Sequence, residues 1–118
     1  MQTVPEFVHK VLKVPPHLKG FVYICKSIQY VIDSDGDSGF YQHLLSLSNQ
    51  SYGQIQKCIN TAKEKALSDM SEVTKEKIYG DNPLPKTKEF ICLAALEYEL
   101  ECEQWRKEGG FSEEQAKG

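Results

Sequence analysis

The sequence lacks the long apolar segment that a membrane protein needs. A membrane-spanning helix takes about 20 predominantly apolar residues, and no such run occurs among these 118 residues. The first residues, MQTVPEF, also lack the basic and then apolar pattern of a secretion signal. We therefore expect a cytoplasmic protein without membrane contact, and its length favours one compact domain.

Cysteine pairs with metal-binding or redox spacing are also missing. The cysteines Cys25, Cys58, Cys92 and Cys102 form no C-x-x-C pair, and each falls within an apolar helical stripe. The three histidines have no zinc-ligand spacing from them. Buried, reduced thiols are the favoured interpretation, with zinc binding as the alternative. We expect neither a metal nor a cofactor.

Catalytic motifs are absent as well. The chain contains no Gly-rich phosphate loop, no G-x-S-x-G and no H-E-x-x-H. An EF-hand counted from Asp33 would need glycine at its sixth position and glutamate at its twelfth, where Ser38 and Leu44 stand. The acidic residues from Glu97 to Glu103 alternate along a predicted helix, which spreads them around a solvated surface. We predict that the protein is not an enzyme and does not bind calcium.

Charge is unevenly distributed, although the formal net charge is only −3. Residues 1–67 contain seven lysines and five acids, whereas residues 68–118 contain seven Lys or Arg and twelve acids. Exposed charges more than about 10 Å apart are largely screened at physiological salt. The acidic C-terminal part therefore does not exclude a nucleic-acid surface on the central part.

Helical periodicity predicts an all-α fold of about six helices. Strand-like alternation of useful length is absent. A capping box at Thr3 predicts a first helix, which we expect to end at Pro15-Pro16. The strongly apolar residues 18–32 predict the central helix of the core. Short helices are predicted at Phe40–Leu47 and at residues 71–78.

The last predicted helix runs from about Thr87 to Lys107. Its predicted inward-facing residues are Phe90, Leu93, Ala94, Leu96 and Leu100. Gly109-Gly110 should end this helix. We therefore predict a single helical domain over residues 1–108 and a flexible C-terminal tail over residues 109–118.

The stretch NQSYGQIQKCINTAKEKA, residues 49–66, predicts the second half of a central helix-turn-helix. A turn at residues 48–50 follows the short helix, and Ser51 with Gln54 matches a second capping box. The buried stripe is predicted to comprise Ile55, Cys58, Ile59, Ala62 and Ala66. Amide, hydroxyl and lysine groups on the outer face are the kinds that read base edges in the major groove. The candidate DNA-binding residues are Ser51, Gly53, Gln54, Gln56, Lys57, Asn60, Thr61 and Lys63.

Several short motifs occur in a characteristic order. VPPHLKGFVY spans residues 14–23, Phe40-Tyr41 precedes Leu44, and Asn49-Gln50-Ser51 precedes the candidate helix. Pro85 and then Glu89-Phe90-Ile91 follow. The first motif resembles the V-P-x-H-[IL]-K-G-[YF]-x-Y signature in the DNA-binding effector domain of the stage zero sporulation master response regulator, a bacterial sporulation initiation factor. The other motifs resemble its helix-turn-helix and its final helix, and the similarity covers residues 4–100.

This resemblance implies a wingless six-helix DNA-binding fold with helix 51–67 in the major groove. The family's Glu-Arg pair falls on Gln56 and Lys57, and its Arg-His pair falls on Asn60 and Thr61. An arginine that pairs with guanine through two hydrogen bonds contributes about 1–3 kcal/mol of discrimination. The missing arginines therefore imply a different target site. The family's receiver domain has no counterpart here, so we expect a stand-alone effector-like domain.

Two functions remain open from the sequence. The first is a sequence-specific transcriptional regulator of the sporulation-initiation type, with double-stranded DNA as its partner. A homodimer on DNA and a related regulator are the alternatives for a protein partner. The second function is a protein–protein interaction module that kept the fold and lost DNA binding, which the missing arginines and the acidic C-terminal part favour.

Overall fold

The computed structural model describes residues 3–35, 39–82 and 84–107, and these residues form six α-helices and no strands. The helices are α1 (Val4–Lys10), α2 (Lys19–Asp33), α3 (Phe40–Leu47), α4 (Tyr52–Asp69), α5 (Glu72–Tyr79) and α6 (Thr87–Trp105). The predicted all-α class is confirmed. The predicted tail, residues 109–118, lies outside the described residues. No helix in the described part of the chain combines the length and apolar character needed to cross a bilayer.

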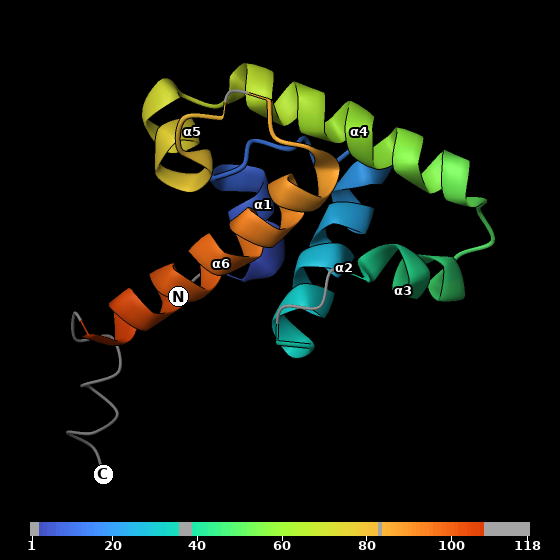
Figure 1. Cartoon of the computed structure of the whole chain (residues 1–118), viewed down its shortest axis with the longest axis horizontal. Coiled ribbons are helices and arrows are strands. Elements are labelled where there is room, and N and C mark those ends of the chain that lie inside the picture. The colour runs from blue at the N-terminus through green and yellow to red at the C-terminus, as the bar shows by residue number, and fades with distance from the viewer. Residues whose placement is uncertain (1–2, 36–38, 83, 108–118) are drawn as a thin grey trace, which may run out of the picture.

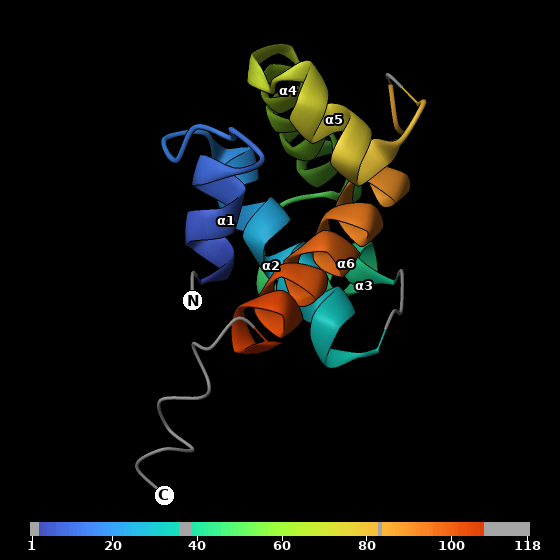
Figure 2. The ribbon, with the colours of Figure 1, turned by 90° about the vertical axis from the view of Figure 1, so that its left-hand side faces the viewer.

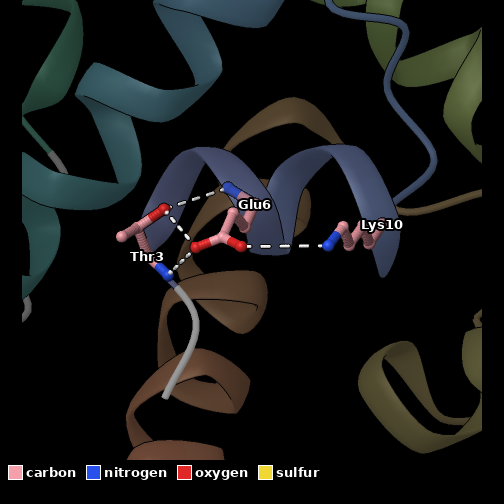
Figure 3. A network of polar contacts seen from close by, with 3 residues as sticks. All are labelled: Thr3, Glu6 and Lys10. Atoms are coloured by element: carbon pink, nitrogen blue, oxygen red, sulfur yellow. Dashed lines mark hydrogen bonds and ion pairs between the residues drawn. The ribbon is translucent and has the colours of Figure 1, made fainter.

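Helix α1 begins at the predicted capping box (Figure 3). The Thr3 hydroxyl accepts a hydrogen bond from the Glu6 N–H at 3.3 Å, and the Glu6 carboxylate accepts one from the Thr3 N–H at 3.1 Å. The pKa of Glu6 is lowered by the hydrogen bonds that its carboxylate accepts from the Thr3 N–H and from the Thr3 hydroxyl, with a smaller contribution from Lys10 3.8 Å away. The helix ends at Lys10, before the proline pair, because the chain turns at Lys13 with a φ of 65°. The predicted end was therefore too late.

Helix α2 lies at the centre of the fold, as predicted. It contacts α1, α3, α4 and α6 (Figure 1). Its core side comprises Ile24, Ile28 and Val31, together with Ser27, whose buried hydroxyl donates to the Tyr23 carbonyl at 2.7 Å. This internal hydrogen bond satisfies the polar group, so Ser27 does not weaken an otherwise apolar contact surface.

The contact between α2 and α4 depends on Gly20. A Cβ atom at this position would lie 2.3 Å from the Cys58 carbonyl oxygen and 2.7 Å from the Ala62 Cβ. Neither neighbour is the end of a flexible side chain, so any larger residue must push the two helices apart. Gly20 therefore sets the distance between α4 and the central helix.

Helix α5 packs against α6 through an aromatic pair and through Lys77, which forms ion pairs with Glu97 and, at 3.9 Å, with Glu101. The Tyr79 ring stacks on Phe90 with centroids 5.4 Å apart, and its hydroxyl donates to the Phe90 carbonyl at 3.0 Å. Lys77 forms an ion pair with Glu97 at 3.1 Å, and this contact raises the pKa of Lys77. Glu97 is only 8% exposed. The prediction of a wholly solvated acidic face was therefore wrong at Glu97, because α5 covers this residue.

Two predicted inward residues of α6 point the other way. Leu96 is 53% exposed and Leu100 is 50% exposed. The buried side of the helix is formed by Phe90, Ile91, Ala94 and Ala95. At 100° per residue, Leu96 and Leu100 lie on the side opposite this group. The prediction was wrong because apolar residues occur on both sides of α6.

The cysteines are also less enclosed than predicted. All four are free and half-buried. Burial raises the pKa of the Cys25 thiol to about 11, so this thiol is protonated at neutral pH and is a poor nucleophile. Within the described ranges, no three His, Cys, Asp or Glu side chains come together as a metal site would require.

Candidate nucleic-acid interface

Helices α3 and α4 contact each other across a short connection. The Ser48 hydroxyl accepts from the Gln50 N–H at 3.0 Å, and the Ser51 hydroxyl accepts from the Gln54 N–H at 3.2 Å. Ser51 is therefore the N-cap of α4, as the capping motif predicted. The Tyr23 hydroxyl lies 3.4 Å from the Ser48 hydroxyl, which ties the connection to α2.

Helix α4 lies at one edge of the molecule, with α3 beside its N-terminal end (Figure 1). In the view turned by 90°, α4 again lies at the opposite end of the molecule from the C-terminal end of α6 (Figure 2). Its buried side is formed by Ile55, Ile59, Ala62, Ala66 and Leu67. This side agrees with the predicted stripe, except that Cys58 is half-buried. The opposite side of α4 faces away from the helices that hold it.

Six of the eight candidate residues are exposed. They are Ser51, Gly53, Gln54, Gln56, Lys57 and Thr61. Gly53, Lys57 and Thr61 follow one another at intervals of four residues, which places them along one side of the helix. A Cβ atom at Gly53 would meet nothing within 4 Å, so the first turn of α4 is open to an approaching ligand.

The other two candidates are half-buried and bonded to the start of α6. The Thr87 hydroxyl donates to the Asn60 side-chain oxygen. The Lys63 ammonium donates to the Pro85 carbonyl at 3.1 Å. The expected full exposure of Asn60 was therefore wrong, because residues 85–87 pass over this part of α4. Asn60 and Lys63 link two parts of the chain that are more than 20 residues apart.

This contact brings two lysines to α4 that the sequence reasoning missed. Lys86 and Lys88 flank Thr87 and are both exposed. The Glu89 carboxylate accepts from the Lys86 N–H at 3.1 Å and so caps the start of α6. Lys57 and Lys63 stand three residues before and after Asn60 on α4, and Lys86 and Lys88 are the sequence neighbours of Thr87, which bonds to Asn60. Among nearby exposed acids, Glu64 and Glu89 offset part of this positive charge.

A buried tyrosine lies at the same junction of α3, α4 and α6. The Tyr41 ring is 5.0 Å from the Tyr52 ring of α4. Burial raises the pKa of Tyr41 more than the nearby Thr87 hydroxyl lowers it, so the phenol remains neutral at physiological pH. Tyr41 and Thr87 together fix α3 and α6 against the same helix. Helix α4 is thus held here by contacts from α3 and from the start of α6.

Comparison of the chain with protein-family models, with curated proteins and with solved structures gave no match in any of the three.

Proposed function

We propose that the chain is a sequence-specific DNA-binding regulator of transcription that uses α3 and α4 as a helix-turn-helix and inserts α4 into the major groove. The observation that carries this proposal is the exposed polar side of the first three turns of α4. From Ser51 to Lys63 this helix contains no carboxylate. Negative charge close to the phosphates opposes binding, and this segment carries none.

The exposed groups have the chemistry that base recognition needs. Gln54 and Gln56 offer an amide donor and acceptor, the combination that pairs with adenine, and Lys57 offers donors for guanine. Gly53 leaves room for a phosphate to approach the N–H groups at the start of α4. We assign base contacts to the exposed side chains. We assign a positioning role to Asn60, because its oxygen already accepts a hydrogen bond from Thr87.

Lys86 and Lys88 extend the proposed interface beyond α4. They are exposed on either side of the residue that contacts Asn60, so they stand where flanking phosphates would pass. Phosphate contacts of this kind set the register of a protein on DNA without reading sequence. The motif resemblance of VPPHLKGFVY supports assigning the chain to the sporulation-initiation effector type. The regulated process is then expected to be bacterial sporulation.

A protein–protein interaction module is the second candidate function. It is favoured by the internal bonds of Asn60 and Lys63, which remove two polar groups from a DNA-facing surface. It is also favoured by the outer side of α6, where glutamates accompany exposed leucines. Such a module would bind a related regulator and would have no affinity for duplex DNA.

Selection from a pool of random duplexes, followed by binding measurements at several salt concentrations, separates the two candidates. We expect an enriched sequence motif and a fall in affinity as salt rises. Two phosphate contacts, by Lys86 and Lys88, predict a slope of roughly −2 for the logarithm of the binding constant against that of the salt concentration. If no sequence is enriched and the protein has no measurable affinity for duplex DNA, the interaction module is the remaining candidate function.

Replacement of Lys57 tests the recognition assignment directly. Lys57→Ala should reduce affinity for the selected duplex by about 1–3 kcal/mol, since a base-contacting group is lost. The matched control is Lys10→Ala, because Lys10 is an exposed lysine on α1. Fluorescence anisotropy with labelled duplex measures both. Equal binding by Lys57→Ala and by the parent would refute the placement of α4 in the groove.

A further inference from the structure

The outer side of α6 carries an apolar stripe that no other described element covers. Leu96 and Leu100 are each about half exposed, and Leu93 is half-buried beside them. These three leucines are spaced by three and four residues, so they form one continuous line. The opposite side of the same helix packs on α2, α4 and α5. Apolar residues on two sides of a helix are typical of helices that pack against neighbours on both sides.

We infer that this outer side is the interface of a homodimer in which two copies of α6 pack antiparallel. The stripe continues in both directions with the same spacing, through Glu89 at one end and Glu103 and Lys107 at the other. This is the spacing of a helix–helix seam. With the two-fold axis beside residue 98, Leu96 of one copy lies opposite Leu100 of the other. The central contact is then made by four leucines, and Leu93 of each copy lies opposite Glu103 of the other at the edge of this contact.

The charges at the ends of the stripe select the antiparallel direction. In this register Glu89 of one copy lies opposite Lys107 of the second copy, and the symmetry repeats the pair. A parallel pair would instead place Glu89 against Glu89 and Lys107 against Lys107. Both side chains are exposed, and the Glu89 carboxylate also accepts the capping hydrogen bond from the Lys86 N–H. Within its own helix, Lys107 forms an ion pair with Glu103 at 3.7 Å.

Charge favours a second copy over other occupants. The groove beside Leu100, between α5 and α6, is lined mainly by polar side chains such as Lys77, Glu97 and Lys107, so it offers polar partners at the edge of the contact. Glu99 beside the stripe and Glu103 within it would repel an anionic membrane or a nucleic acid, whereas in the dimer the Glu89–Lys107 pairs offset part of this negative charge. One helix pair covers less area than a standard interface. We therefore expect reversible association in the micromolar range or weaker.

Sedimentation velocity on the full chain, without DNA, tests this dimer. We expect the sedimentation coefficient of the parent to rise with concentration between about 10 µM and about 1 mM. The double variant Leu96→Asn/Leu100→Asn should stay monomeric. The matched control, Val73→Asn/Leu84→Asn, also replaces two apolar residues that are each 78% exposed, one on α5 and one in the connection before α6, and should associate like the parent. A parent chain that remains monomeric, or a leucine variant that associates equally well, would overturn the proposal.

A charge exchange tests the register. Lys107→Glu should weaken the dimer roughly tenfold, because two attractive pairs become repulsive. The double variant Glu89→Lys/Lys107→Glu should recover most of that loss in an antiparallel dimer and none of it in a parallel one. Because Glu89 also caps α6, circular dichroism must show unchanged helix content. Failure of the exchange to restore association in a folded variant contradicts the antiparallel pairing. These measurements involve no DNA, so they are independent of the proposed regulatory function.

Discussion

Helices α4 and α6 are nearly equal in length, with 18 and 19 residues, but their outer sides differ in chemistry. Both pack on α2. The outer side of α4 begins with glycine, amides, a lysine and a threonine, whereas that of α6 alternates leucines with glutamates. The first has the chemistry of the proposed anionic ligand site. The second has the chemistry of the proposed contact with a helix that presents leucines at its centre and opposite charges at its ends. The same scaffold therefore presents two surfaces for two different kinds of contact.

The two helices are also attached to the centre of the fold by different means. At Gly20, α4 approaches the backbone of α2 so closely that no side chain fits between them. Helix α6 is held instead by large side chains, of which Phe90 is fully buried and stacked on Tyr79. A backbone contact leaves little freedom in distance, whereas packed side chains can rearrange. The position of α4 is therefore the more rigidly determined of the two.

The largest expected effect is the loss of the α6 anchor. Phe90→Ala should lower the free energy of unfolding by about 3–5 kcal/mol, because it removes a buried ring and leaves a cavity beside Tyr79. Urea unfolding followed by circular dichroism measures this change. Trp105→Ala, at the exposed end of the same helix, is the control and should cost far less. Similar losses in the two variants would show that α6 is not anchored through Phe90.

A pair of glycine substitutions tests the α4 anchor next. Gly20 and Gly53 each occupy the second position of a helix, so the helix-propensity gain from alanine should be similar in both. Gly53→Ala should raise stability by about 0.4–1 kcal/mol, since its Cβ meets nothing within 4 Å. Gly20→Ala should lower stability by about 1–3 kcal/mol, because the clash with Cys58 exceeds that gain. Thermal melting that shifts both variants in the same direction would contradict the close approach of α2 and α4.

Local signals in the sequence predicted much of the fold. The capping motifs at Thr3 and Ser51 mark helix starts that the structure contains, because a cap depends on residues only three positions apart. The buried stripe of α4 was predicted for the same reason, since helical periodicity alone determines which side is apolar. On α6 that signal failed. Leu96 and Leu100 are as apolar as core residues, and periodicity cannot distinguish between two apolar sides of one helix.

The parts of the site that sequence reasoning missed depend on long-range contacts. Nothing near Asn60 indicates that Thr87, 27 residues later, donates a hydrogen bond to it. The proximity of Lys86 and Lys88 to α4 follows from that one contact. The only available signal was the lysine pair itself, placed directly before and after the first residue of a predicted helix. The helix-turn-helix assignment and the family resemblance remain predictions that the DNA experiments test.

The smallest expected effect concerns the single hydrogen bond that joins the two helices. Thr87→Val keeps the shape of the side chain but removes the hydroxyl that donates to Asn60, so we expect a loss of about 0.5–1.5 kcal/mol in unfolding free energy. Thr61→Val is the matched control, because Thr61 is exposed on α4 and should change stability by less than about 0.5 kcal/mol. In DNA binding the order should be reversed. Thr61→Val should lose more affinity than Thr87→Val, since Thr61 belongs to the proposed reading surface and Thr87 only holds Asn60 in place. If Thr87→Val unfolds like the parent, the start of α6 does not hold α4 in place, and Lys86 and Lys88 lose their assigned position at the interface.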